Sequence, residues 1–207
     1  MALTFYYAPM TSAVRVQWAL EELGVPYEKV RVDLQAGAQK KPEYLKINPN
    51  GKVPALVDDG VPMFESLAIL IHLGEKYGVA KKLWPAPGTA EQMQALSWTV
   101  WGTVTAASHL FRVMYNTLDR FPAAERNLAQ AEAAKKDFGQ CLEILDHALT
   151  GKDYLVGNAF SLVDVANAST VAFGGMRLGI DFSTYKNVTA WVARSTQRPA
   201  MARAAAG

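Results

Sequence analysis

The sequence predicts a mixed α/β unit, with elements in the order βαβ-ββα, followed by an all-helical half. Over the first eighty of its 207 residues, short apolar runs alternate with segments of helical period. Beyond residue 90, apolar side chains recur every three or four positions almost throughout. The stretch 81–89 between these parts is rich in proline and glycine. We therefore expect domains at residues 1–80 and 91–207, joined by a linker at 81–90.

The first elements of the chain predict a βαβ unit. Residues 3–7 are a compact apolar and aromatic run, which is typical of a strand. Apolar residues over 14–23 have helical spacing, and Gly24 and Pro26 end this helix. Residues 27–32 then alternate between two sets of side chains, as a second strand does.

The rest of the first half predicts a short helix, a hairpin and a longer helix. A polar segment near 42–47 indicates the short helix. Residues 54–57 and 62–64 flank a turn at 58–60, which indicates a β-hairpin. The helix expected over 66–77 is apolar on most sides, so we expect it to be packed between layers.

A long helix opens the second half and presents two stripes of side chains. We expect the first stripe to pack in the core of this half. The second stripe is then available for contacts outside that core. The first comprises Met93, Leu96, Val100, Val104, Ala107, Phe111 and Met114. The second comprises Trp98, Trp101, Thr105, Arg112 and Tyr115.

The later helices have clear boundaries. A second long helix carries an apolar stripe over 138–149, which includes Cys141, and it ends before Gly151. Ser161 and Asp164 have the spacing of a capping box, in which each side chain accepts a free backbone N–H of the first turn. A terminal helix is expected from about residue 188.

The composition excludes several classes of function. The net charge of +2, from 21 basic and 19 acidic residues, is too small for the basic surface of a nucleic-acid-binding protein. Cys141 is the single cysteine, so an internal disulfide and a cysteine-built zinc site are excluded, and we expect no metal site. The most apolar run, residues 67–73, is far shorter than the about 20 residues of a membrane span. Since the first residues also lack a signal-peptide pattern, we expect a cytosolic protein.

The segment 48–56 carries the clearest sign of a binding site. Asn-Pro and Asn-Gly at 48–51 form a turn, after which Lys52 and Val53 are extended. Pro54 begins a strand, where its missing amide hydrogen is tolerated. A cis Val53–Pro54 bond would point the amide and carbonyl of Val53 outward, where they can pair with another extended peptide.

Two further pairs of residues complete this pattern. Ser66 begins a helix, so its hydroxyl and the free amides of the first turn suit a carboxylate, while the adjacent Glu65 suits an ammonium group. Together they fit an α-amino acid. Lys40 and Lys52, from two loops, are candidates for holding a second carboxylate. On residue types alone, a helix cap at Glu65 and Ser66 and solvated surface lysines remain the alternatives.

Taken with the order of elements, these motifs resemble the cytosolic glutathione transferases of bacterial type over nearly the whole chain. The segments that carry the resemblance are 5–9, 19–27, 48–56, 64–66, 157–164 and 198–200. The resemblance implies a thioredoxin-like N-terminal domain that binds glutathione. It also implies an α-helical domain that lines the pocket for an electrophile.

The resemblance also assigns binding roles to individual residues. It places Val53 in backbone contact with the cysteinyl part of glutathione, with Pro54 as the cis proline. The positions that match those binding the two ends of glutathione are Glu65 and Ser66 for the γ-glutamyl end, and Gln39, Lys40 and Lys52 near the glycine carboxylate.

At the position of the residue that activates the thiol, the sequence combines a feature of the theta and delta groups with a feature of the beta group. Thr11 stands where the theta and delta groups have a serine, four residues before Arg15. Ser12 stands at the place of the beta group's cysteine, so a mixed disulfide with glutathione cannot form there. We rank Thr11 first as the donor to sulfur, Ser12 second, and Tyr6 or Tyr7 third. The competing role for Thr11 and Ser12 is an ordinary helix N-cap.

The function implied by the resemblance is thiolate attack on a hydrophobic electrophile, the chemistry of detoxification, in a homodimer without nucleic-acid or membrane partners. Glutathione would be the co-substrate. The candidate pocket residues of the helical half are Trp101, Thr105, His109 and Arg112, for which core packing is the alternative role. Two other functions stay open, namely a glutathione-dependent peroxidase or disulfide reductase and a non-catalytic binding module.

Overall fold

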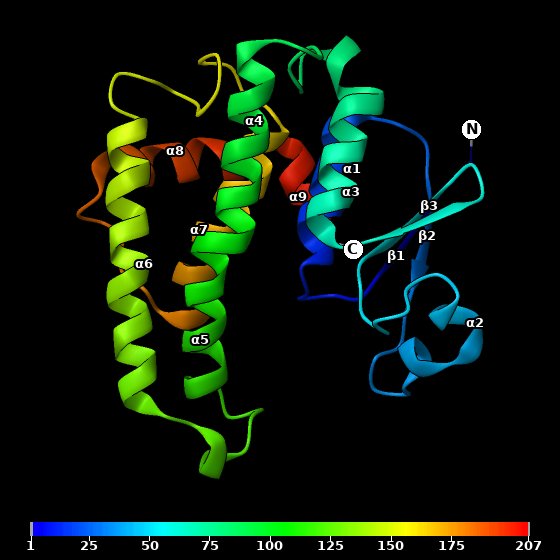
Figure 1. The fold of residues 1–207 in the computed structure, drawn as a ribbon, viewed down its shortest axis with the longest axis horizontal. Coiled ribbons are helices and arrows are strands. Elements are labelled where there is room, and N and C mark those ends of the chain that lie inside the picture. Colours follow the sequence, from blue (N-terminus) through cyan, green and yellow to red (C-terminus); the bar gives the residue numbers. More distant parts are fainter. Residues whose placement is uncertain (1, 207) are drawn as a thin grey trace. The chain divides into compact units, whose positions relative to one another are not determined.

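The computed structural model describes residues 2–206 and divides into two compact units (Figure 1). The first unit runs to Gln92 and also includes the segment from Gln197 onward. The second unit is Met93–Thr196. The expected fold class, a thioredoxin-like domain of order βαβ-ββα followed by an all-helical domain, is confirmed.

The first unit is built on a four-stranded sheet of order β2-β1-β3-β4. Strand β1 pairs in parallel with β2 and antiparallel with β3, which in turn pairs antiparallel with β4. A parallel pair needs a crossover between its strands, and helix α1 provides it. The elements are β1 (Leu3–Tyr7), α1 (Ala13–Leu23), β2 (Glu28–Arg31), α2 (Pro42–Leu45), β3 (Ala55–Asp58), β4 (Val61–Phe64) and α3 (Ser66–Leu73).

The two faces of the sheet have different partners, because successive strand residues point to opposite sides. Phe5 is fully buried on the face covered by α1. Tyr6 points to the other face, where its ring meets that of Tyr44 from α2 at a centroid distance of 5.8 Å. Tyr44 forms a small core there with Val32 and Ala55. Helix α2 therefore covers the face opposite α1 (Figure 1).

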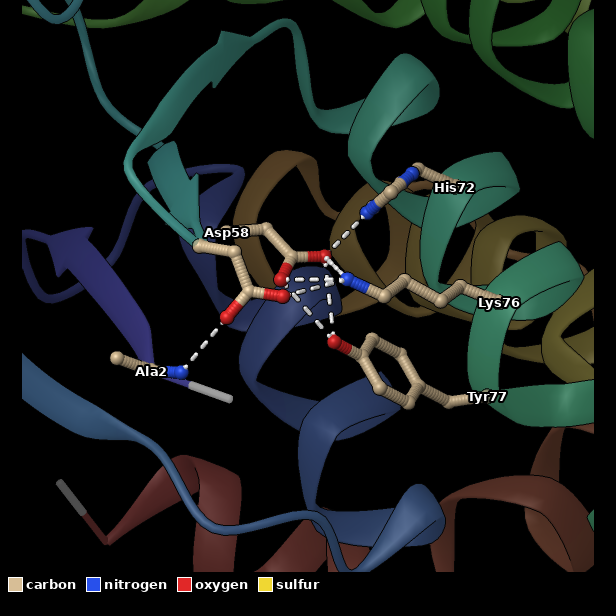
Figure 2. Close-up of polar contacts among 6 residues, drawn as sticks. Ala2, Asp58, His72, Lys76 and Tyr77 are labelled. Carbon is tan, nitrogen blue, oxygen red and sulfur yellow. Dashed lines mark hydrogen bonds and ion pairs between the residues drawn. The ribbon is translucent and has the colours of Figure 1, made fainter.

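A charged cluster holds the turn of the hairpin against the end of α3 (Figure 2). The buried carboxylate of Asp58 accepts hydrogen bonds from His72 Nε2 at 2.6 Å, Lys76 Nζ at 2.8 Å and the Tyr77 hydroxyl at 3.1 Å. Burial alone would raise the pKa of Asp58, but these hydrogen bonds outweigh it and hold the pKa below its ordinary value. Lys76 and Tyr77 belong to a π-helical turn, Gly74–Gly78, that continues α3.

The final helix, α9 (Pro199–Ala205), packs against α1 in the first unit. Arg198 donates two hydrogen bonds of 2.7 Å to Glu22, and Arg203 Nε lies 2.6 Å from Glu21 Oε2. The domain boundaries expected from the sequence, 91–207 for the helical half, include this segment there, whereas residues 197–206 group with the first unit. Two ion pairs join this segment to α1, and no local pattern in the sequence reveals them.

The second unit consists of helices. They are α4 (Ala90–Val100), which starts just before the boundary, a π-helical turn at Trp101–Ala106, α5 (Ala107–Thr117), α6 (Leu128–Ala148), α7 (Leu162–Leu178) and α8 (Lys186–Thr196). The stripe of α6 that includes Cys141 is buried as expected, and the capping box of Ser161 and Asp164 is present. Asp164 also accepts a hydrogen bond from Trp191 Nε1 at 2.9 Å, so it joins α7 to α8.

The core stripe expected on the first long helix is confirmed at Ala107 and Met114, which are buried, and is wrong at Met93, Val100, Val104 and Phe111, which are exposed. Met93 is 71% exposed and Val104 is 59% exposed, while smaller residues face the core in their place. Gly102 shows the reason, since a side-chain carbon there would collide with Asn167 of α7. Two helices this close leave no room for large side chains. The buried residues of this helix are Ala95, Thr99, Gly102, Ala106, Ala107, Leu110, Val113 and Met114.

Candidate functional site

The register of the sheet brings three segments of the first unit to the same end of the strands. Tyr6, near the end of β1, pairs with Ala55 at the start of β3, and Ala55 pairs with Phe64 at the end of β4. The loop after β1, the loop before β3 and the start of α3 after β4 therefore meet at the same end of the sheet. These segments contain Thr11 and Ser12, Val53 and Pro54, and Glu65 and Ser66.

The loop before β3 presents its backbone. The Val53–Pro54 bond is cis, as expected. Within residues 2–206, the Val53 amide donates no hydrogen bond. The preceding carbonyl, that of Lys52, accepts two hydrogen bonds of 2.7 Å, one from the Tyr44 hydroxyl and one from Asn48 Nδ2. The site therefore offers one unpaired amide beside one carbonyl that is fully engaged.

Glu65 and Ser66 stand where β4 turns into α3. Glu65 has φ of 68°, a conformation that residues other than glycine rarely adopt. Such a conformation costs on the order of 1–3 kcal/mol, and residues that adopt it cluster at functional sites. Ser66 is the first residue of α3 and is 8% exposed. The free amides of the first turn and the positive end of the helix dipole lie at this point.

The two hydroxyls before α1 differ in their hydrogen bonds. The Thr11 hydroxyl donates to the Ala8 carbonyl at 2.8 Å and accepts from the Ala13 amide at 3.2 Å. It therefore stabilises the start of the helix. Ser12 is exposed, and its hydroxyl makes no hydrogen bond within the described part of the chain. Of the two, Ser12 has the hydroxyl that is available to a ligand.

The two tyrosines of β1 point to opposite faces of the sheet. Tyr6 lies toward α2, in contact with the cluster that includes Tyr44. Tyr7 stacks on Phe5 at a centroid distance of 5.8 Å, and Lys29 Nζ lies 4.5 Å from the Tyr7 ring. The face with α2 also carries Val53, so Tyr6 is the tyrosine on the side of the exposed backbone.

Two loops carry the predicted carboxylate-binding residues. Lys40 Nζ donates to the Asn50 carbonyl at 3.4 Å. A side-chain carbon at Gly51 would lie 2.8 Å from both the Gln39 carbonyl oxygen and Lys40 Nζ, so the loops are in close contact there. The Oε1 atom of Gln39 is buried without a hydrogen-bond partner in residues 2–206, and Lys52 is exposed. Gln39 and Lys40 thus lie beside the turn that precedes Lys52 in the sequence.

The candidate pocket residues of the second unit lie along the π-helical turn and α5. The Trp101 ring packs edge-on against Trp98 at a centroid distance of 5.2 Å, and Thr105 is exposed. Arg112 Nη1 donates to Asp137 of α6 at 2.9 Å, and His109 Nδ1 lies 3.7 Å from the same carboxylate. Arg112 is therefore engaged in the contact between α5 and α6, whereas the buried Nδ1 atom of His109 makes no hydrogen bond within residues 2–206.

Two residues of the first unit were missed by sequence reasoning. Tyr44 and Asn48 act on the Lys52 carbonyl from α2 and from the loop after it. Asn48 is the first residue of the turn in segment 48–56, so its place in that motif could have indicated its role. Tyr44 has no motif around it. In residues 2–206, no three metal-binding side chains gather and no helix is long and apolar enough to cross a membrane.

Comparisons with known proteins identify the family. One family model, "Glutathione S-transferase, N-terminal domain", matches residues 1–75, and "Glutathione S-transferase, C-terminal domain" matches residues 103–199. Glutathione S-transferase F10 of Arabidopsis thaliana is 32% identical, with 97% of this chain and 94% of that protein covered. Disulfide-bond oxidoreductase YfcG of Escherichia coli is 31% identical, with 98% and 94% covered.

A solved structure agrees with these relatives. The glutathione transferase URE2P8 of Phanerochaete chrysosporium, crystallised with oxidised glutathione, matches with a TM-score of 0.88 and 26% identity. The match covers 98% of this chain and 92% of that one. Both domains, the fold and full-length relatives thus agree, and the chain belongs to the glutathione S-transferase family.

Proposed function

We propose that this protein is a glutathione transferase that binds glutathione at the first unit as a thiolate and directs it at a hydrophobic electrophile. The observation that carries the proposal is the convergence of three segments at one end of the sheet. They offer an unpaired backbone amide, a helix N-terminus and exposed hydroxyl and ammonium groups. An extended tripeptide with two charged ends and a central thiol requires these groups.

Each part of glutathione has a partner in this proposal. The α-carboxylate of the γ-glutamyl residue binds at the start of α3 through Ser66, and Glu65 pairs with the ammonium group. The cysteinyl part pairs with the backbone of Val53 beside Pro54 as an added strand. The glycine carboxylate lies near Gln39, Lys40 and Lys52.

A hydroxyl at the start of α1 activates the thiol. A free thiol has a pKa of about 8.5, and a donor aimed at sulfur near a helix N-terminus lowers it. Ser12 donates directly, because its hydroxyl is uncommitted, whereas Thr11 must first release the Ala8 carbonyl. Tyr6 is the remaining candidate. The thiolate then forms a C–S bond with the electrophile, and the leaving group departs or a proton from solvent completes the addition.

The helical unit supplies the electrophile's surroundings. Trp101 offers an aromatic surface and Thr105 an exposed hydroxyl. Arg112 is held by its hydrogen bond to Asp137, and the unpaired Nδ1 atom of His109 lies 3.7 Å from the same carboxylate. The protein acts as a cytoplasmic homodimer in this proposal, with detoxification as its role.

Disulfide reduction is the second candidate function. It is favoured by the relative named a disulfide-bond oxidoreductase and by the neighbour crystallised with oxidised glutathione. Two glutathione thiols would reduce one disulfide to two thiols and leave one glutathione disulfide. No enzyme cysteine is needed for this, which suits Ser12 at the place of a cysteine and Cys141 in the core.

The first experiment is calorimetric titration with reduced glutathione, followed by the ultraviolet thiolate absorbance of the complex against pH. We expect binding, with a thiol pKa below that of free glutathione. The variants Ser12→Ala and Thr11→Ala identify the donor, since its loss returns the thiol pKa toward the free value while glutathione still binds. Binding with an unshifted thiol would indicate a carrier module, and absence of binding would overturn the proposal.

Turnover assays then separate the two reactions. A chloronitrobenzene electrophile reports conjugation, and a mixed disulfide of glutathione with a small thiol reports reduction. Faster turnover of the mixed disulfide would replace conjugation by the second candidate function.

A further inference from the structure

The carbonyl of Lys52 is held by two donors from different elements. The Tyr44 hydroxyl comes from α2 and Asn48 Nδ2 from the following loop, and each is 2.7 Å from the oxygen. A carbonyl oxygen has two lone pairs, so both are engaged. The peptide between Lys52 and Val53 therefore cannot rotate without breaking two short hydrogen bonds.

The orientation of this carbonyl determines that of the next amide. In a trans peptide the C=O and N–H groups lie in one plane and point in opposite directions. Because the Lys52 oxygen points toward Tyr44 and Asn48, the Val53 N–H points away from them. That amide has no hydrogen-bond partner within residues 2–206.

Both donors are themselves fixed. Asn48 is 2% exposed, and its Oδ1 accepts the Asn50 amide at 3.0 Å, which orients its Nδ2 toward Lys52. Tyr44 is 7% exposed, with its ring against Tyr6. Burial, together with the nearby Tyr6 hydroxyl, raises the pKa of Tyr44 to about 12, so its hydroxyl keeps its proton at neutral pH.

We propose that Tyr44 and Asn48 are positioning residues for glutathione, which hold the Lys52–Val53 peptide so that the Val53 amide faces the cysteinyl carbonyl of the ligand. The inference rests on the proposed function. It assigns affinity for the cysteinyl part to two side chains that act only through the backbone. The entropy of orienting the peptide is then lost on folding rather than on binding, which strengthens binding.

The test compares three single variants. Tyr44→Phe removes one donor and keeps the ring. Asn48→Asp keeps the acceptor for Asn50 and places an oxygen against the Lys52 carbonyl. Tyr27→Phe is the matched control, because it removes a phenol hydrogen bond of 2.8 Å to Glu21 on α1. Circular dichroism melting confirms that each variant is folded. If Asn48→Asp does not fold, Tyr44→Phe alone tests the proposal.

The readouts are the dissociation constant of reduced glutathione and the hydrogen exchange of the Val53 amide. In the wild-type protein we expect saturating glutathione to slow this exchange. We expect Tyr44→Phe to weaken binding about tenfold, Asn48→Asp to weaken it more, and both to reduce the protection of Val53. Tyr27→Phe should leave both readouts unchanged.

The outcomes distinguish this inference from the proposed function. If wild-type protein does not bind glutathione, the proposed function fails. If the wild type binds and protects Val53, but folded Tyr44→Phe binds and protects equally well, the positioning role is overturned and the proposed function stands.

Discussion

The two units of this protein carry their candidate functional groups in different ways. In the first unit, backbone features dominate, namely an unpaired amide at Val53, an unusual φ at Glu65 and the start of α3. In the second unit, the candidates are side chains along the π-helical turn and α5. A backbone site suits a ligand that stays constant, because backbone groups persist through most substitutions. Side chains on a helix surface change freely and suit a variable partner.

The largest effect that tests this comparison is expected at the start of α3. Ser66→Ala removes a hydroxyl from a charged carboxylate, and such hydrogen bonds contribute about 1.5–3 kcal/mol. We expect glutathione binding by calorimetry to weaken about 10- to 100-fold. Ser97→Ala is the control, because the Ser97 hydroxyl is exposed and bonds only within α4 in the described structure. Equal affinities for wild type and Ser66→Ala would remove α3 from the site.

The next largest effect is expected on the electrophile and not on glutathione. Trp101→Ala removes the aromatic surface of the π-helical turn, so we expect kcat/KM for an aromatic electrophile to fall about tenfold. Glutathione affinity should not change, since the first unit supplies the proposed glutathione contacts. A parallel loss of both would contradict the division of labour between the units.

A third effect concerns the stability of the first unit in acid. The pKa of Asp58 is lowered in the folded state, so its stabilising contribution is complete above the unfolded pKa of about 3.9 and is lost as pH falls through the lower folded pKa. We expect wild type to melt at a higher temperature than Asp58→Asn above about pH 4 and the difference to shrink below it. Melting curves from pH 2 to 7 measure this. A difference independent of pH would show that the carboxylate charge is unimportant.

The smallest effect is expected at Arg112. Its ion pair with Asp137 is partly exposed, and such pairs contribute about 0.2–1 kcal/mol. Arg112→Gln should therefore lower the free energy of unfolding only slightly, as measured in urea. A large change in electrophile turnover with little change in stability would show that Arg112 also contacts the electrophile.

The order of elements was predictable because each strand of the first unit carries its own local signals. Apolar runs, the turn at Asp58 to Gly60 and the proline after Val53 all act within a few residues. The candidate glutathione site followed from the same short motifs together with the family resemblance. The conformation of Glu65 and the engagement of the Thr11 hydroxyl required the folded backbone.

The failures have physical causes. Hydropathy favours large apolar residues for the core, but the first long helix approaches α7 so closely that Gly102 and Ala106 face inward. Residues 197–206 group with the first unit, where Arg198 and Arg203 pair with glutamates of α1. Neither a close helix contact nor an ion pair across the chain leaves a periodic signal.

The pairing of α9 with α1 has a consequence for how the protein is made. Arg198 and its partner Glu22 are 176 positions apart. At a synthesis rate of about 5–20 residues per second, α1 waits about 10 to 35 s for α9 to be translated. During that time the carboxylate of Glu22 lacks its arginine and one side of α1 is uncovered. The first unit is therefore completed only after the whole second unit has been synthesised.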